Sequence, residues 1–360
     1  MRQSIGIPSL DSARDERSGL SRGDFLRAWA PMKILHLLAS PFFTGPAELV
    51  TQLALAQRAL GHDVSIAVDR KRTTTTSEEL IVPRLEPLGL LSSAPLELSV
   101  KSTPWTMLRD VMALRSQPVD VVHAHFSHDH SIARLGRPKG AQVVRSIHAP
   151  RSIRWGMPQA DGFTIPMESL SRRLLGQRVL VLPALVGPEF VPASDRAALR
   201  RELGLPEGRL VGMVSTFQVS RRHALGLAAF ATIKDASMLL VGDGPLLAEL
   251  RSPGNERVRF AGYQSGPAFV KHLQALDEVW ILGLGNDWSA RAAAQARACG
   301  VRVVAVDEGA LARYADALVE PTVESLAAAA LRPERQQHQV ESPEAIARRV
   351  VGFYGAGAAG

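Results

Sequence analysis

Residues 285–305 read GNDWSARAAAQARACGVRVVA, and no other segment says as much about the fold. A polar loop leads into an alanine-rich segment of high helix propensity, Gly300 ends it, and a run of β-branched residues follows. This order predicts a loop, a helix, a glycine stop and a buried strand. Such a unit directs the N-terminus of its helix toward an edge of a sheet, where it can hold a phosphate.

Polar side chains gather around the start of this predicted helix. Asp287 stands just before it, Arg291 falls in its first turn, and Gln295 lies two turns beyond Asp287 on roughly the same face. The backbone amides of Ser289 and Ala290 lie at the positive end of the helix dipole. We therefore expect an anionic ligand to bind at this N-terminus.

Strand-length apolar runs alternate with helix-length segments along the rest of the chain. In the first half the predicted strands are 33–38, 64–68, 119–123, 143–147, 162–165 and 179–182, and the predicted helices are 46–60, 106–114 and 169–175. In the second half the predicted strands are 210–214, 237–241, 258–260, 278–282 and 302–306. Continuous Val and Ile runs are typical of parallel sheets that helices cover on both faces.

The composition changes near Pro183, where proline, glycine and then charged residues accumulate as in a linker. We therefore predict an α/β protein of two Rossmann-like domains, whose parallel sheets face a central cleft. The predicted parts are a disordered extension over 1–31, an N-terminal domain over 32–188, a linker over 189–206, a C-terminal domain over 207–342, and a terminal helix with a frayed tail over 343–360.

Composition excludes several classes of protein. With 360 residues, 46% of them hydrophobic, the chain can build two cores of ordinary size. Its longest apolar runs fall far short of the ~20 residues that span a bilayer, and residues 1–31 lack the apolar stretch of a signal peptide. The single cysteine, Cys299, excludes an internal disulfide framework and is typical of a reducing compartment, so we expect a cytoplasmic protein.

The chain is basic, with a formal net charge of +7. One cluster of cations comprises Arg134, Arg137, Lys139, Arg145, Arg151 and Arg154. Phosphorylated small molecules or an anionic membrane surface would suit this charge. Aromatic residues make up only 5% of the chain and no basic stripe is interleaved with them, which argues against nucleic acid as a partner. An arginine-rich composition without functional meaning is the alternative.

Histidines crowd residues 123–130, which read HAHFSHDH. Histidines at alternate strand positions share a face, and the run resembles the His-x-His-x-Asp-His signature of metallo-β-lactamase-type hydrolases. Ser127 stands where that signature has its aspartate, and the later histidines are His148, His223, His272 and His338. Metal-dependent hydrolysis is therefore one reading, and capping or surface roles for His128 and His130 are the favoured one.

An ordered set of short motifs resembles GT-B glycosyltransferases of the large retaining family four. In the first half these are MKILHLL at 32–38, GPAELV at 45–50, GHDV at 61–64, VDVVHAH at 119–125, VRSIH at 144–148 and VLPALVG at 181–187. In the second half they are VGMVS at 211–215, VGDGP at 241–245, FAGY at 260–263 and ACGVRVVA at 298–305. The resemblance covers nearly all of the chain from residue 32 to about 330 and implies the two-domain GT-B fold.

The resemblance also implies how a nucleotide-sugar donor would be held. The family places an arginine just after the first strand of its second domain and a cation five residues later, both on the donor diphosphate. The first position is Thr216 here, and the second is Arg221 with Arg222 beside it. Two family glutamates eight residues apart, for the transferred sugar and the ribose, correspond to Asp287 and Gln295.

Three further positions follow from the resemblance. Trp288 occupies a position that is commonly glycine, where its bulk would reshape the pocket. Gly45 joins the first strand to its helix, close to the reacting groups. His148 matches a histidine that the family points into the cleft, where it could hydrogen-bond the transferred sugar or the acceptor. A purely structural role is the alternative for this histidine.

The function implied by the resemblance is glycosyl transfer with retention of configuration, from a nucleotide-diphosphate sugar to a glycan, lipid-linked or small-molecule acceptor. The implied catalytic residues are His148 and Asp287, and the implied donor-binding residues are Gly45, Arg221, Arg222, Asp287, Ser289, Ala290, Arg291 and Gln295. No metal or cofactor is expected, and the basic first domain could touch the inner face of an anionic membrane. A catalytically silent GT-B relative that binds or scaffolds is the alternative.

Overall fold

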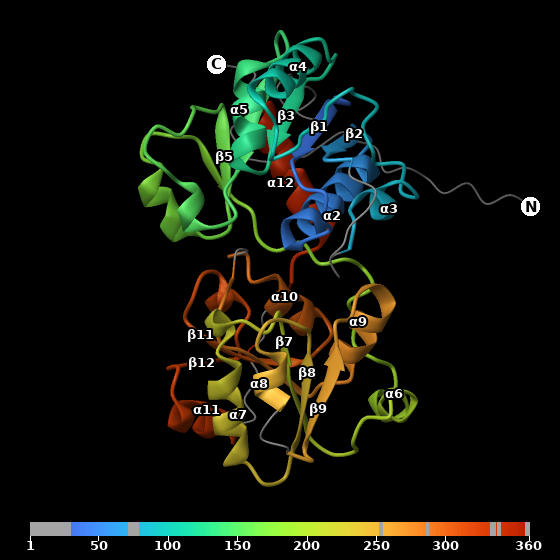
Figure 1. The fold of residues 1–360 in the computed structure, drawn as a ribbon, viewed down its shortest axis with the longest axis vertical. Helices are drawn as coiled ribbons and strands as arrows, with labels where there is room; N and C mark the ends of the chain where they lie inside the picture. Colours follow the sequence, from blue (N-terminus) through green and yellow to red (C-terminus); the bar gives the residue numbers. More distant parts are fainter. Residues whose placement is uncertain are drawn as a thin grey trace, which may run out of the picture.

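The computed structural model describes residues 30–70, 79–251, 255–285, 288–331, 336 and 340–356. Two domains lie one above the other along the longest axis of the molecule, each built around its own sheet (Figure 1). Most of the expected N-terminal extension and the last four residues of the expected frayed tail, 357–360, lie outside the described residues.

The first domain contains a parallel sheet in the order β2-β1-β3-β4-β5-β6. Its strands are β1 (Lys33–Leu38), β2 (Asp63–Val68), β3 (Val121–Ala124), β4 (Gln142–Ser146), β5 (Gly162–Ile165) and β6 (Val179–Val181). Its helices are α2 (Gly45–Ala59), α3 (Val82–Leu85), α4 (Pro104–Arg115) and α5 (Ser127–Leu135), with 3-10 helices η1 (Pro150–Ser152) and η2 (Glu168–Arg173). The strand order reverses between β1 and β3, a topological switch point of the kind where such sheets bind ligands.

The second domain repeats this plan, with the strand order β12-β11-β10-β7-β8-β9. Its strands are β7 (Leu210–Val214), β8 (Ser237–Val241), β9 (Val258–Gly262), β10 (Glu278–Ile281), β11 (Arg302–Val306) and β12 (Ala317–Val319). Its helices are α6 (Arg196–Glu202), α7 (His223–Ala231), α8 (Leu247–Arg251), α9 (Gly266–Gln274), α10 (Arg291–Ala298) and α11 (Val323–Ala330), with 3-10 helices η3 (Val219–Arg221) and η4 (Leu311–Arg313). Its switch point lies between β7 and β10.

Burial of both sheet faces explains why the strands read as unbroken apolar runs. In β1, Ile34 and Leu38 join one core cluster while Leu35 and Leu37 join the cluster on the opposite face. All five residues of β11 are buried in the core of the second domain. The prediction of an α/β fold with two parallel sheets is therefore confirmed.

The last helix, α12 (Pro343–Gly355), returns to the first domain and packs against α2. Figure 1 shows it lying on that domain rather than on the second one. Ile346 and Val350 enter the core cluster that α2 helps to form, and Tyr354 is fully buried. The C-terminal helix therefore completes the first domain.

Two segments differ from the sequence predictions. The predicted linker contains α6, capped by Asp195, and Arg196 and Arg200 bind Asp277 at 3.2 and 2.7 Å, which fixes this helix to the second domain. The predicted α-helix at 169–175 is instead the 3-10 helix η2. Within η2 only Leu170 is buried, so the segment lacks the apolar stripe that stabilises an α-helix.

None of the helices in the described ranges is both long enough and apolar enough to cross a membrane.

Candidate functional site

A cleft of about 1660 Å³ lies between the two domains, at the carboxyl ends of both sheets. The first domain contributes the loop after β1, the start of α2 and the loop after β4. The second contributes the loops after β7, β8 and β10 and the first turns of α10. Both topological switch points therefore open into one cavity, as the rules for open α/β sheets require of a binding site.

The predicted anion site at the start of α10 faces this cleft. Ala290, Arg291 and Gln295 line it, and Ser289 and Ala290 are almost fully buried. Ala290 caps the helix in the left-handed conformation, with φ 59°, which a residue with a side chain adopts at an energetic cost. The backbone is thus held in an uncommon geometry where it approaches the cavity. Asp287, the predicted partner of the transferred sugar, lies outside the described residues.

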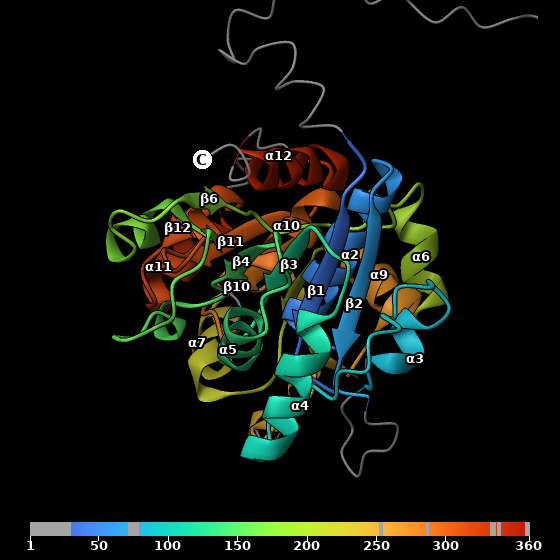
Figure 2. The ribbon, with the colours of Figure 1, turned by 90° about the horizontal axis from the view of Figure 1, so that it is seen from above.

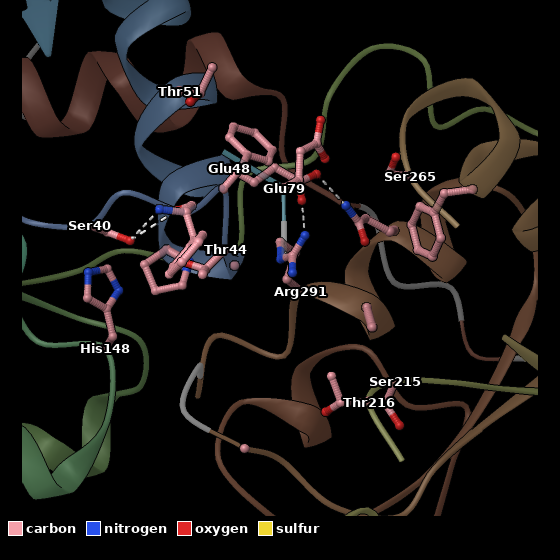
Figure 3. A pocket seen from close by; sticks show the side chains of 18 of the residues that line it. Ser40, Thr44, Glu48, Thr51, Glu79, His148, Ser215, Thr216, Ser265 and Arg291 are labelled. Atoms are coloured by element: carbon pink, nitrogen blue, oxygen red, sulfur yellow. Dashed lines mark hydrogen bonds and ion pairs between the residues drawn. The ribbon is translucent and has the colours of Figure 1, made fainter. Parts of the chain in front are cut away.

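Arg291 and Gln295 are bound by a carboxylate from the other domain. Glu48, in the first turn of α2, forms an ion pair with Arg291 and accepts a hydrogen bond from Gln295 Nε2 at 2.8 Å. Figure 3 shows Glu48 and Arg291 pointing toward one another across the cleft. Burial lowers the pKa of Arg291 to about 10, which leaves the guanidinium charged at neutral pH. Glu48 was not among the site residues predicted from the sequence, although it belongs to the GPAELV motif at 45–50.

A second contact joins the two domains at Trp288, the bulky residue at a position that is commonly glycine. The backbone N–H of Trp288 donates to the carbonyl oxygen of His148 at 2.9 Å, and Trp288 accepts from the N–H of Ala310 at 3.1 Å. The Trp288 side chain is half-buried and lies beside Gly309. The loop before α10 is therefore held against the loop after β4, where the two halves of the cleft meet.

The two neighbouring arginines are placed differently. Arg221 lines the cleft, with Nη1 donating to the carbonyl oxygen of Gly283 at 2.9 Å. Arg222 does not line it: its guanidinium donates to the carbonyl of Leu282 and pairs with Glu308 at 3.4 Å. Thr216 is exposed in the cleft just after β7, as the order of the motifs predicts. Arg221 is thus the arginine of this pair that faces the cavity.

His148 and Gly45 line the cleft from the first domain. His148 follows β4 and is 8% exposed, and its ring stacks on that of His125 with 5.8 Å between centroids. Burial, with a contribution from the charge of Arg145, lowers the pKa of His148 to about 3. The imidazole is therefore neutral at physiological pH and serves as a hydrogen-bonding group rather than as a cation.

Behind His148 the buried histidines of the sheet form a hydrogen-bonded chain. Gln57 donates to the Tyr354 hydroxyl at 3.2 Å, and that hydroxyl is also hydrogen-bonded to His123 Nδ1 at 2.7 Å. His36 Nε2 donates to Gln57 Oε1 at 2.8 Å, which leaves its Nδ1 to accept from His125 Nε2 at 2.9 Å. The contacts thus fix the tautomers of the neutral His36 and His125 rings.

The same three histidines are a group that could hold a metal ion, with ligand atoms within 4.8 Å of one another. Their nitrogens are largely engaged in the chain just described. Burial lowers the pKa values of His123 and His125 well below the usual value, and the charges of neighbouring histidines and of Arg145 lower them further. A dication would have to displace these hydrogen bonds beside that positive charge. The geometry therefore favours a structural network.

The histidine run at 123–130, whose alternative reading was a hydrolase signature, is not gathered in one place. His123 and His125 lie on one face of the sheet, as their spacing predicts. His128 contacts Ser102 at 3.4 Å, and His130 packs edge-on against Phe163. The reason is that α5 begins at Ser127, so the later histidines follow helical rather than strand geometry.

Comparison with known proteins gives one consistent answer for both domains. Residues 43–182 match the family described as Glycosyltransferase Family 4, and residues 208–333 match Glycosyl transferases group 1. D-inositol 3-phosphate glycosyltransferase of Mycobacterium ulcerans is 25% identical over 231 residues, which are 53% of this chain and 50% of that protein. N-acetyl-alpha-D-glucosaminyl L-malate synthase of Bacillus anthracis is 25% identical over 225 residues, 54% of this chain and 58% of that protein. The match thus spans about half the length of these curated relatives.

Solved structures share the fold over most of the chain. HepE of Anabaena in complex with UDP and glucose superposes with a TM-score of 0.66 at 17% identity, covering 89% of this chain and 94% of that one. Sucrose-phosphate synthase of Thermosynechococcus elongatus gives a TM-score of 0.64 at 18% identity, covering 91% and 94%. At these identities the similarity establishes the arrangement of the two domains and nothing finer.

Proposed function

Because the chain belongs to the group 1 glycosyltransferases of the GT-B fold, we propose that it transfers a sugar from a nucleotide-diphosphate donor to a hydroxyl acceptor with retention of configuration. The observation that carries this proposal is the single cleft into which both switch points open, with Arg221, Arg291 and the N-terminus of α10 on its second-domain side. These groups suit a diphosphate.

The donor would occupy the second-domain side of the cleft. Arg221, Arg291 and the amides around Ala290 would hold the diphosphate, and Gln295 would hydrogen-bond the ribose. Asp287 would hold hydroxyls of the transferred sugar. A solved relative binds UDP and UDP-glucose and another binds ADP, so nucleoside diphosphates of this size are the first ligands to test.

The acceptor would occupy the first-domain side, near Gly45 and His148. Single ligand pockets commonly measure about 300–1,000 Å³. The 1660 Å³ of this cleft therefore leaves room for a glycan, lipid-linked or small-molecule acceptor beside the donor. The neutral His148 ring would hydrogen-bond the acceptor or the transferred sugar.

The bonds that break and form in the reaction determine where negative charge develops. The bond between the anomeric carbon and the diphosphate oxygen breaks while the acceptor oxygen bonds to that carbon. Arg221, Arg291 and the α10 dipole would stabilise the negative charge that grows on the departing diphosphate, without a metal ion. His148, with its pKa lowered to about 3, is a weak base. The departing diphosphate is thus the stronger base for the acceptor proton.

An assay of nucleoside diphosphate release tests this proposal. The full chain is incubated with UDP-, ADP- and GDP-sugars in the presence of hydroxyl acceptors, and the anomeric configuration of any product is read by NMR. Release that depends on both the protein and an acceptor, with a retained anomer, supports the proposal. An inverted product contradicts the stereochemical part.

A catalytically silent binding protein is the second candidate. Two observations favour it: Thr216 puts no cation at its position in the cleft, and Glu48 already occupies Arg291 and Gln295. Such a protein would bind a nucleoside diphosphate without releasing one from any sugar conjugate, so the assay above combined with a binding measurement distinguishes the two candidates.

A further inference from the structure

One face of α4 exposes large apolar side chains to solvent. Trp105, Leu108 and Met112 are 70%, 48% and 56% exposed, and their spacing places them on one side of the helix. Leu135 at the end of α5 and Val100 in the loop before α4 are also exposed, at 57% and 59%. These five residues are called the α4 face below. Large apolar side chains that are exposed on one side of a helix are typical of interaction surfaces.

The opposite side of α4 is firmly attached to the domain, so the exposed side is not a core face that has come loose. Val111 and Leu114 are buried in a core cluster. The buried carboxylate of Asp110 accepts hydrogen bonds from the backbone of Glu97 at 2.7 Å and of Leu98 at 3.1 Å. Thr103 caps the helix by accepting from the N–H of Thr106 at 3.2 Å. The helix therefore presents the α4 face on a rigid support.

Cations border the apolar residues. The exposed basic side chains here are Lys101, Arg109, Arg115 and Arg134. The nearby acid is Glu97, which pairs with Arg109 at 3.2 Å, and Asp110 is buried. Exposed charge on this margin of the domain is thus predominantly positive. A tryptophan and aliphatic side chains with arginines at their edge suit the interface of an anionic bilayer.

We propose that the α4 face docks this protein on the surface of an anionic lipid bilayer. Figure 2 shows α4 at the margin of the first domain, beside α5. Trp105, Leu108 and Met112 enter the boundary between headgroups and acyl chains, and the cations pair with lipid phosphates. Two copies of this chain would both carry a net positive charge of +7. Charge complementarity therefore favours an anionic lipid surface over a second copy as the partner.

Docking has a consequence for the cleft, and this consequence alone rests on the proposed function. Val100 and Lys101 line the cleft and lead directly into α4. A bilayer against the α4 face would therefore lie next to one mouth of the cavity. That placement would let an acceptor carried by a lipid enter the first-domain side without leaving the membrane.

Vesicle flotation tests the proposal with the full chain. The probes are vesicles of phosphatidylcholine alone and of phosphatidylcholine mixed with phosphatidylglycerol, at low and high salt. The variants are Trp105→Ser/Met112→Ser, Arg109→Gln/Arg134→Gln, and Leu331→Ser as a matched control, because Leu331 is an exposed leucine, 74% accessible, in the other domain. Unfolding temperature and UDP binding are measured on every variant, which separates a lost surface from a lost fold or a failed donor site.

The expected result is that wild type and Leu331→Ser float with the anionic vesicles and not with the neutral ones. Partitioning should fall at least about tenfold for Trp105→Ser/Met112→Ser, and Arg109→Gln/Arg134→Gln should lose the salt-sensitive part. Wild type that stays in the bottom fraction at low salt would overturn the proposal, as would equal flotation of the apolar variant. A wild-type dimer that the apolar substitutions dissociate would overturn it in favour of self-association.

Discussion

Glu48 of the first domain and Arg291 of the second form an ion pair across the cleft, at the helix N-terminus where a diphosphate would bind. Gln295, one turn further along α10, donates to the same carboxylate at 2.8 Å. A donor that uses these two side chains must take them from Glu48. The carboxylate holds the two domains together, and it would act as an internal competitor of the proposed donor.

Replacing Glu48 with Gln should tighten nucleotide binding. The change removes a negative charge beside the proposed diphosphate site while keeping the size of the side chain. We expect the Kd for UDP to fall by about three- to tenfold, since the competing pair is partly buried. Isothermal titration calorimetry measures it. Weaker binding by Glu48→Gln would show that Glu48 supports the donor instead.

Thr216→Arg should also strengthen donor binding. Thr216 is exposed in the cleft after β7, and the family resemblance places an arginine there. A guanidinium at this position adds a charge-assisted contact to the diphosphate, for which we expect about a tenfold lower Kd. The matched control is Thr216→Gln, which has similar reach and no charge. Equal effects of the two substitutions would contradict the assignment.

The sheets and most strands could be predicted because their signal is local. The predicted strands 210–214, 237–241 and 302–306 coincide with β7, β8 and β11. A strand that is buried on both faces is apolar at consecutive positions, so it can be recognised without knowing which segments pack against it. The same logic placed the first long helix at 46–60, within one residue of α2 at both ends.

The partners of site residues could not be predicted, because they depend on the packing of distant segments. Glu48 and Arg291 are 243 residues apart in the sequence, and neither motif indicates that the two side chains would meet. Tyr354 reaches His123 only because α12 returns to the first domain. In α6 the signal was present, since Asp195 precedes the helix as a cap, but the charged sequence suggested a linker.

Tyr354→Phe should destabilise the first domain. The change removes the hydroxyl that bonds His123 and Gln57 and leaves two buried polar groups without it. We expect the free energy of unfolding to fall by about 1–3 kcal/mol. Urea unfolding measures the loss. Tyr263→Phe, at a tyrosine that is 56% exposed, is the control and should change little.

Stability should decline as the pH falls from about 6.5 toward 4. Burial lowers the pKa values of His36, His130 and His223 to about 4, and that of His148 to about 3. Unfolded histidines take up protons near pH 6.5, while the folded ones resist until the lower values, so the stabilisation is complete above pH 6.5 and is lost below it.

Each such histidine contributes up to about 1.4 kcal/mol per pH unit to this decline. The slope of the unfolding free energy against pH reports the number of protons taken up on unfolding. His148→Asn should therefore lower that number by about one between pH 6 and 4. Urea titrations at a series of pH values measure it. An unchanged slope would mean that His148 is not held neutral.

The most direct test of the donor site is calorimetric titration of UDP, ADP and GDP into wild type, Arg221→Ala, and Arg313→Ala as a control arginine of the second domain outside the cleft. We predict that at least one nucleoside diphosphate binds wild type and Arg313→Ala alike, and that its affinity falls about tenfold or more in Arg221→Ala. Absence of binding by all three nucleotides, or equal affinity in Arg221→Ala, would contradict the account.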